Sequence, residues 1–475
     1  MDAKVTTNKN FIYNLLYEVI IVLTPLIITP YVSRVLGAEL IGARSYTFAI
    51  LSYFELFANL GIAIYGQREI AKIKNDREKR SRVFLSLFAL KSVSFLLVLL
   101  GYCAVFFAFG VLSKYKVLFL LWIIHLFESF FNVTWYFQGV EKFKHISLRG
   151  IVIRIIQIIA TLIFVKTTDD FYIYILLYAL FPLLQAVSLW PFLIKDIEWK
   201  QIKNVSLRIH LKDVLVFFIP TVATVIYSNV DKIMLGSMLE NTIQVGYYES
   251  AQHIVLLCTT VFTSLFVVMR SRISAQMTEN NECATSIRET IIYFVKVCSL
   301  VVFPVSFGLL AISDNFVIVF FGEEFEPVIN MLRLFIPIVL ILGLSGFISS
   351  IYIVPFDKQK YLAFFYIIAT LLNVVLNFIL IPVIFSYGAI ISSIVAEFVV
   401  LLGCVFLSRK HFSIVDFLKC GWKYILSSLI MFASVFGIKF VLCYGLWQLV
   451  VEIVIGVLVY GLALLILRDD FISPI

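Results

Sequence analysis

Long apolar segments follow one another along almost the whole chain, and they limit its fold more than any other feature. A helix needs about 20 apolar residues to cross the hydrocarbon core of a bilayer, because each residue adds about 1.5 Å. We find such segments at 11–33, 42–65, 83–109, 117–138, 147–166, 171–194, 213–236, 245–269, 289–311, 328–354, 361–381, 386–407, 422–443 and 446–467. The sequence therefore predicts an all-α polytopic membrane protein with about 14 transmembrane helices.

The composition supports this fold class and excludes an aqueous one. Hydrophobic residues make up 61% of the chain and charged residues 14%, and the mean hydropathy is +1.01. Soluble domains are about half apolar and a quarter charged. We expect the first apolar segment to be a retained helix, since it is long enough to span. Around 312–327 we expect a short, acidic outer loop.

Several kinds of chemistry have no sequence signal. The seven Cys are scattered without a CxxC pair, so neither disulfides nor a metal site is predicted. No GxxxxGK[ST] motif occurs, and the loops are too short for an ATPase domain. His125 and His253 stand isolated in apolar segments, which favours packing or cavity roles over catalysis. We expect no cofactor and no enzyme activity.

The basic residues indicate the orientation. Of the 38 Lys and Arg, 27 fall in alternate connections that include both chain ends, and seven fall in the other connections. Cytoplasmic loops of membrane proteins carry the excess of positive charge. We therefore expect both termini in the cytoplasm. The same distribution argues against a nucleic-acid partner.

A weak internal repeat suggests two lobes. The stretch YVSRVLGAELIGARSY at 31–46 is similar to VDKIMLGSMLENTIQVGYYES at 230–250. Six helices fit between them, so the two halves would share one orientation. We expect a six-helix lobe at 1–194, a cytoplasmic linker at 195–212, a second six-helix lobe at 213–408, and two further helices with a short tail at 409–475.

Several motifs resemble one family of membrane proteins. They are the N-terminal stretch from Asn10 that contains PYVSRVLG, then LGIAIYGQREIA at 60–71, WYFQGVEKF at 135–143, VDKIMLG at 230–236 and VGYYESA at 245–251. In this order and spacing they resemble Wzx-type oligosaccharide flippases of the multidrug/oligosaccharidyl-lipid/polysaccharide (MOP) exporter superfamily. The resemblance implies a two-lobed transporter related to the multidrug exporters and the lipid II flippase.

The resemblance also implies a function. Such proteins move an undecaprenyl-diphosphate-linked oligosaccharide across the bacterial cytoplasmic membrane by alternating access, for capsule, exopolysaccharide or O-antigen, with a polysaccharide polymerase and a chain-length regulator as expected partners. Two alternatives stay open: a cation-coupled multidrug exporter of the same fold, and a membrane polymerase or ligase. The latter class would need a large outer loop, which the sequence does not predict.

A diphosphate and a sugar chain need a polar path through hydrocarbon, so charges inside helices are candidate site residues. Six cations qualify as parts of a diphosphate or glycan cavity: Arg34, Arg44, Lys91, Arg154, Lys296 and Arg333. The competing interpretation is that their long stems reach the nearest interface.

Carboxylates have short stems, so the same explanation suits them less well. The candidates for ion coupling or charge pairing are Glu55, Glu128, Asp231, Lys232, Glu249 and Glu397. Asp231 and Lys232 end the predicted seventh helix at the place where the first repeat carries no charge. We expect either an ion-coupling role in the second lobe or a mutually satisfied Asp–Lys pair.

Overall fold

A computed structural model of the chain describes residues 2–279, 284–409, 414–439 and 445–469. Within these ranges the regular structure is helical and includes no strand, which confirms the all-α prediction. Thirteen stretches of the described residues are long and apolar enough to cross a membrane. The chain divides into two compact units, Met1–Ile233 and Met234–Ile475.

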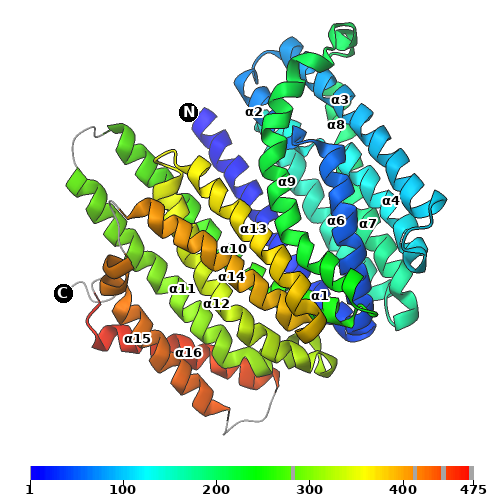
Figure 1. Cartoon of the computed structure of the whole chain (residues 1–475). Helices are drawn as coiled ribbons and strands as arrows, with labels where there is room; N and C mark the ends of the chain where they lie inside the picture. The colour runs from blue at the N-terminus through cyan, green and yellow to red at the C-terminus, as the bar shows by residue number, and fades with distance from the viewer. Residues whose placement is uncertain (1, 280–283, 410–413, 440–444, 470–475) are drawn as a thin grey trace. The chain divides into compact units, whose positions relative to one another are not determined.

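Unit 1 contains the helices α1 to α8 and the larger part of α9 (Figure 1). Their bounds are α1 (Asp2–Asn59), α2 (Ile62–Lys72), α3 (Arg77–Cys103), α4 (Lys116–Phe131), α5 (Thr134–Gly139), α6 (Phe143–Phe164), α7 (Phe171–Val187), α8 (Trp190–Asp196) and α9 (Leu207–Met238), with short helical turns at Ala104–Ala108, Ser113–Tyr115, Thr168–Asp170 and Trp199–Asn204. The unit boundary falls inside α9.

Unit 2 contains seven helices among the described residues. They are α10 (Ile243–Glu279), α11 (Ala284–Phe321), α12 (Glu326–Ile348), α13 (Gln359–Ile384), α14 (Ser386–Ser408), α15 (Ile414–Ile438) and α16 (Leu446–Ile466), with short helical turns at Glu323–Phe325 and Ser349–Ile353. The last two correspond to the two C-terminal helices that the sequence predicts.

Helix α1 holds two of the predicted segments, 11–33 and 42–65. The spanning stretch Val19–Lys72 has 54 residues, about 80 Å if straight, which far exceeds one bilayer crossing. Gly37 has φ 76° and ψ 175°, so the helix breaks there. A residue with a side chain rarely adopts this φ. The predicted turn is therefore real but much shorter than the sequence suggested.

Other predicted boundaries were wrong where a helix ends early or continues. The predicted helix 117–138 stops at Phe131 and restarts at Thr134, and 171–194 is divided between α7 and α8. The predicted acidic loop at 312–327 is wrong, because α11 continues to Phe321. Its apolar run FVIVFF outweighs the acidic residues on either side of it.

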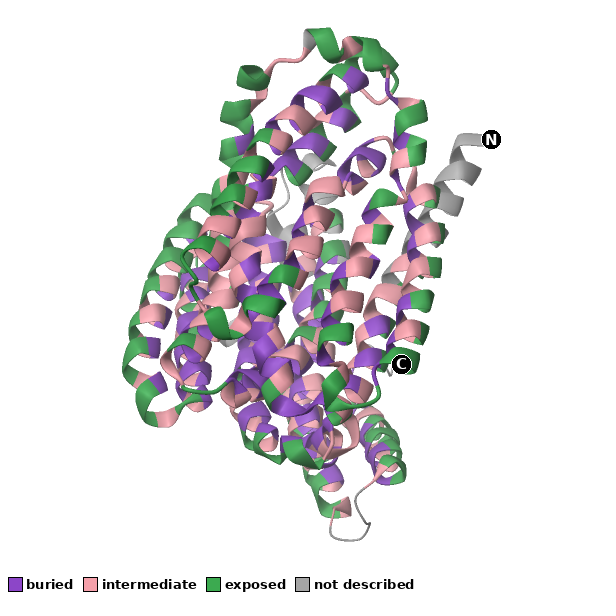
Figure 2. Ribbon diagram, turned by 90° about the vertical axis from the view of Figure 1, so that its right-hand side faces the viewer, coloured by how far each residue is buried: buried purple, intermediate pink, exposed green. Residues whose placement is uncertain are grey.

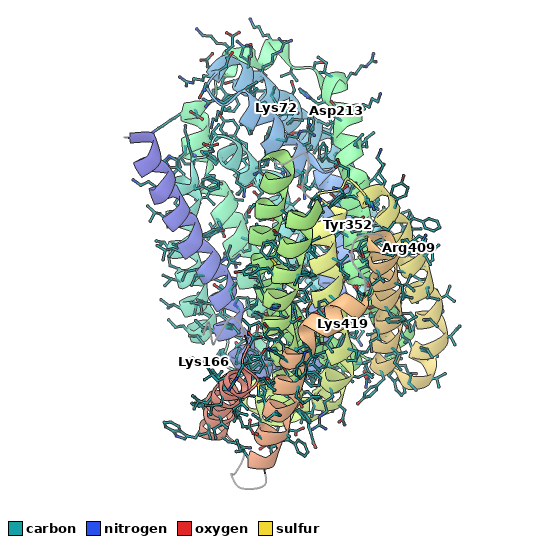
Figure 3. The ribbon with its side chains drawn as sticks, turned by 90° about the vertical axis from the view of Figure 1, so that its left-hand side faces the viewer. Lys72, Lys166, Asp213, Tyr352, Arg409 and Lys419 are labelled. Atoms are coloured by element: carbon teal, nitrogen blue, oxygen red, sulfur yellow. The ribbon has the colours of Figure 1, made fainter. Side chains whose placement is uncertain are left out.

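The packing of unit 1 suits a lipid environment. In α3 the buried face includes Phe84 and Leu87, each 0% exposed. The opposite face exposes Leu96, Leu97 and Leu100 at 57%, 66% and 69%, and Figure 2 shows the same alternation of buried and exposed residues along many helices. A large exposed apolar face is favourable in hydrocarbon. Lys72 and Asp213 lie at one end of this unit and Lys166 at the other (Figure 3).

Two of the family-like motifs pack against each other in unit 1. LGIAIYGQREIA forms α2, and WYFQGVEKF forms α5 and the turn after it. A Cβ built on Gly66 would lie 2.6 Å from Cε3 of Trp135, and one built on Gly139 would lie 2.8 Å from Cβ of Ile70. Glycine at both positions therefore lets the two short helices approach closely.

Asp196 joins this region to the end of α8. Its carboxylate accepts a hydrogen bond from Tyr136 Oη at 2.8 Å. It also forms ion pairs with Lys142 at 2.9 Å and Arg80 at 3.6 Å. Arg80, at the start of α3, is only 8% exposed. This basic residue therefore contributes to the packing of the region.

Candidate functional site

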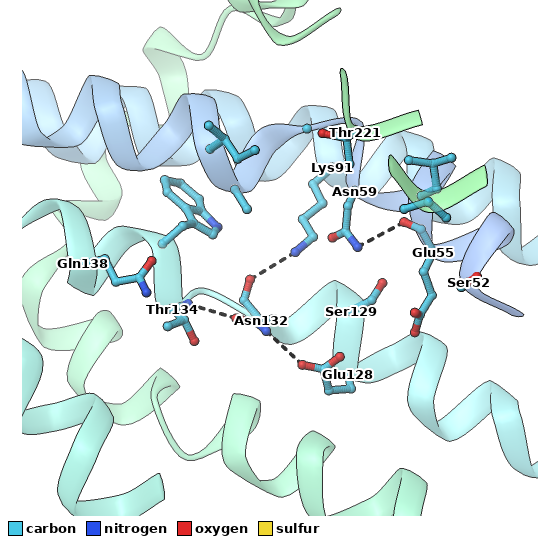
Figure 4. A pocket seen from close by; sticks show the side chains of 16 residues that line it. Ser52, Glu55, Asn59, Lys91, Glu128, Ser129, Asn132, Thr134, Gln138 and Thr221 are labelled. Carbon is cyan, nitrogen blue, oxygen red and sulfur yellow. Dashed lines mark hydrogen bonds between the residues drawn. The ribbon is translucent and has the colours of Figure 1, made fainter. Parts of the chain in front are cut away.

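A pocket of about 530 Å³ lies among the spanning helices of unit 1 (Figure 4). Its volume is in the usual range for small-molecule sites. Helix α1 contributes one face of residues at helical spacing, and α2, α3, α4, α5 and α9 complete the wall. The lining residues are Ser52, Glu55, Leu56, Asn59, Gly61, Ala63, Ile64, Lys91, Glu128, Ser129, Asn132, Thr134, Trp135, Gln138, Thr221 and Val225.

The break between α4 and α5 holds Lys91 in this pocket. Asn132 ends α4, so its own carbonyl has no partner within that helix. The Nζ of Lys91 donates a hydrogen bond to this carbonyl at 3.1 Å. An ammonium group at a helix C-terminus is also stabilised by the helix dipole. Lys91 is 3% exposed, and this hydrogen bond leaves its other N–H groups for further acceptors.

Asn132 connects this lysine to a carboxylate. Its Nδ2 donates to Glu128 Oε1 at 2.9 Å, and its Oδ1 accepts from the backbone N–H of Thr134 at 3.1 Å. All these bonds are drawn in Figure 4. The side chain therefore forms hydrogen bonds on both sides of the break, which fixes Glu128 and the carbonyl bound by Lys91 in one arrangement.

A second carboxylate is paired with an imidazole. Nδ1 of His125 lies 2.7 Å from Oε1 of Glu55. One ligand-type atom from each of Glu55, His125 and Glu128 lies within 4.8 Å of the others. His125 and Glu128 are three residues apart on α4 and so share a face of that helix. The rings of Phe48, Trp122 and Tyr178 surround the imidazole.

Two further polar groups of the pocket wall have no hydrogen-bond partner among the described residues. They are Oγ of Ser129 and Nε1 of Trp135, on side chains that are 4% and 3% exposed. Buried polar groups normally find partners. A ligand with oxygen acceptors could bind both groups together with Lys91.

The structure brings Lys91, Glu55 and Glu128 of the predicted set together. Arg44 lies near them, because its guanidinium carbon is 5.3 Å from the centroid of Tyr178, the ring that also contacts His125. Arg34 is exposed on α1. Arg154 lies on α6, where its Nη1 donates to Gln157 at 3.2 Å, and it does not line the pocket.

The remaining candidates do not line this pocket. Arg333 on α12 pairs with Asp314 of α11. Lys296 is partly buried on α11, Glu249 is partly buried on α10, and Glu397 is buried on α14. Asp231 is buried and Lys232 partly buried inside α9, which continues to Met238. The prediction that these two residues end their helix was therefore wrong by about two turns.

Sequence reasoning missed three members of the site. His125 was expected to be isolated, yet it pairs with Glu55, whose helix is far away in the sequence. Asn132 and Ser129 were not singled out. The spacing of His125, Glu128 and Ser129 on one helix face was a usable signal.

Solved structures resemble this fold. The lipid II flippase MurJ in an inward closed conformation matches with a TM-score of 0.75 and 20% identity, over 97% of this chain and all of that one. An inward-facing MATE family multidrug resistance transporter of the MOP superfamily matches with a TM-score of 0.64 and 17% identity, over 84% and 95% of the two chains. The chain thus has the fold of these two solved membrane proteins, and its pocket lies among helices that are long and apolar enough to span a bilayer.

The sequence comparisons go further than the fold. The chain belongs to the polysaccharide biosynthesis protein family, whose model matches residues 7–273. It is 24% identical to a putative O-antigen transporter of Escherichia coli K12 over 83% of this chain and 94% of that protein. A putative O-antigen transporter of Shigella dysenteriae is 22% identical, over 80% and 94%. These matches confirm the resemblance to Wzx-type flippases.

Proposed function

We propose that this protein is a flippase for undecaprenyl-diphosphate-linked oligosaccharide repeat units. It moves them from the cytoplasmic to the outer leaflet by alternating access, for a surface polysaccharide such as capsule, exopolysaccharide or O-antigen. The family match, the names of the two curated relatives and the MurJ-like fold support this proposal. The protein is then a transporter and not an enzyme.

The observation that carries the proposal is the polar pocket of unit 1. Lys91 is nearly fully buried within a spanning helix, and a charge at that depth is costly unless it serves a polar path or a partner. Its unused N–H groups and the free donor of Trp135 suit phosphate or sugar oxygens. The amides and hydroxyls of the lining suit sugar hydroxyls.

The orientation belongs to the same proposal. We place the protein in the bacterial cytoplasmic membrane with both termini inside, since 27 of the 38 Lys and Arg fall on that side. The lobes at 1–194 and 213–408 would carry out alternating access, with 195–212 as a cytoplasmic linker and 409–475 as an accessory pair of helices. A polymerase and a chain-length regulator would receive the product outside.

A deletion in the source bacterium tests the function. We expect lipid-linked oligosaccharide to accumulate on the cytoplasmic leaflet, where an impermeant lectin or oxidant does not reach it in spheroplasts. Surface polysaccharide should disappear and return with a plasmid copy. Normal surface glycan together with increased sensitivity to drugs would contradict the proposal and favour the multidrug exporter.

A further inference from the structure

We propose that Glu55, His125 and Glu128 form a binding site for one divalent transition-metal cation, of the Mn²⁺ or Zn²⁺ type, in the wall of the unit 1 pocket. Sequence spacing alone does not predict the complete site, because His125 and Glu128 lie on α4 whereas Glu55 lies on α1. The site goes beyond the proposed flippase activity, and it can be tested without any glycan.

The three ligand atoms already lie in one cluster. Nδ1 of His125 and one oxygen of each carboxylate are within 4.8 Å of one another. Three ligands held about 2.0–2.2 Å from one metal ion and spaced equally around it are at most about 3.8 Å apart. Side-chain rotations that move the ligand atoms by about 1 Å would therefore complete the coordination.

The ligand types select the class of metal. Imidazole with carboxylates suits Mn²⁺, Fe²⁺ and Zn²⁺, whereas Mg²⁺ and Ca²⁺ prefer oxygen ligands alone. A His and a Glu three residues apart on one helix, facing a Glu of another helix, is also how metal sites are built inside helical bundles. The packed rings around His125 fix its imidazole, as a preorganised ligand requires.

Ser129 provides an independent indication of a ligand. It follows Glu128 on α4 and is 4% exposed, and its Oγ has no hydrogen-bond partner among the described residues. Figure 4 shows its side chain beside the carboxylates of Glu128 and Glu55, in the wall of the pocket. This hydroxyl is placed to bind the metal or a water molecule on it. Because Glu55 and Glu128 border the pocket, the ion has an entry path.

The metal would also change what the pocket can hold. With neutral His125, the charges of Glu55 and Glu128 cancel those of the ion, and Lys91 then leaves the pocket with one net positive charge. Phosphate oxygens could occupy the open coordination positions. This consequence rests on the proposed flippase function, but the metal site itself does not.

The direct test uses full-length, untagged protein in nanodiscs after removal of metals with a chelator. We expect one equivalent of Mn²⁺ in an EPR titration, and nitrogen coupling from one imidazole in the pulsed EPR spectrum. Zn²⁺ should compete for the same site. Because these measurements use the unmodified protein, they do not depend on whether a variant folds. Absence of stoichiometric binding, or a bound ion without nitrogen coupling, would overturn the proposal.

Variants then locate the site. H125Q and E128Q should each weaken Mn²⁺ binding at least about tenfold, since even outer-shell changes around metals cost 10–100-fold. The matched controls are H145Q and E141Q, which lie outside the pocket and should bind as the unmodified protein does. Undiminished binding by correctly folded H125Q would rule the site out and leave a cluster that holds only protons. Absence of flipping by the unmodified protein, together with intact metal binding, would count against the flippase alone.

Discussion

Charges in or next to apolar helices have different surroundings in the two units. In unit 1, Lys91 donates to a single backbone carbonyl, and Glu55 and Glu128 border a pocket of about 530 Å³. In unit 2, the carboxylate of Asp314 is shared by two cations, Arg333 and Lys439. The position of a charge in a hydrophobic segment therefore does not tell whether it belongs to a candidate binding site or to a structural ion pair. The groups that the charge contacts distinguish the two cases.

The unit 2 arrangement joins its last two helices to α11. Lys439, just after α15, lies 2.5 Å from Asp314. Next to it, Asn315 accepts from the N–H of Gly445 at 3.0 Å, and Glu452 of α16 is 0% exposed and accepts from Gln448 at 2.7 Å. These contacts pair most of the polar groups buried here, as hydrocarbon requires, and Oε1 of Gln448 alone among the side-chain atoms named has no hydrogen-bond partner among the described residues.

The largest effect is expected at the unit 1 pocket. K91M removes the buried ammonium that the proposed substrate needs, and we expect transport to fall at least about tenfold, or about 1.4 kcal/mol. The measurement is surface polysaccharide restored in the deletion strain, divided by the amount of protein in the membrane. K116Q, a change at an exposed lysine of the same unit, is the control. Full activity of K91M would break the contrast between the two units.

The corresponding change in unit 2 should act on stability instead. D314N leaves Arg333 and Lys439 without their carboxylate, and we expect a loss of about 2 kcal/mol in unfolding free energy. The loss should be smaller than for a fully buried pair, because the Arg333 side chain is 38% exposed. Thermal unfolding in detergent measures it. Normal stability with abolished transport per folded molecule would mean that this cluster is a site too.

A pair of glycine substitutions sharpens the same contrast. A Cβ on Gly66 would meet Trp135 of the pocket wall at 2.6 Å, and one on Gly343 would meet Val302 in unit 2 at 2.6 Å. G66A and G343A should each destabilise by about 1–3 kcal/mol through overpacking. We expect a fall in transport per folded molecule in G66A alone. G101A, with open space around it, is the control, and equal transport losses in G66A and G343A would contradict the assignment.

The smallest effect is expected at an exposed ion pair of unit 1. Lys74 and Glu141 are 2.8 Å apart, and their side chains are 40% and 59% exposed. Such pairs contribute less than about 1 kcal/mol. E141Q should therefore leave both thermal unfolding and transport close to normal, and it sets the baseline for the three tests above. A drop of several degrees in the unfolding temperature of E141Q would show that this ion pair contributes more than its exposure indicates.

Much of the fold could be predicted from hydropathy alone. The apolar segments determine the helices, because hydrocarbon leaves the backbone few other ways to satisfy its polar groups. What hydropathy could not predict was the breaks. Asn132 interrupts a continuous apolar run, and its effect depends on hydrogen bonds to Lys91, Glu128 and Thr134 that only the three-dimensional structure shows. The error at 312–327 was of the opposite kind: the acidic residues suggested a loop, but the helix continues through Asp314.

The site was predictable in part. Lys91, Glu55 and Glu128 stood out as charges inside helices, and the structure places them around one pocket. His125 could not be assigned, because its partner lies 70 positions away in the sequence. Arg333 looked like the same kind of residue as Lys91 until its pairing with Asp314 was known. In each case the assignment depended on which residues contact the side chain in the folded protein, and a single sequence does not give these contacts.

The buried lysine also bears on how the protein is made. A Lys at the middle of a membrane helix opposes insertion by about 2.5–3.5 kcal/mol, whereas each Leu, Ile, Phe or Val favours it by about 0.3–0.6 kcal/mol. An 18-residue window of the spanning stretch that contains α3 has a mean hydropathy of 2.4, so the apolar residues around Lys91 favour its insertion. Replacing Lys91 by Met should make this segment enter the bilayer more readily. A transport defect in that variant would therefore not reflect failed insertion of α3.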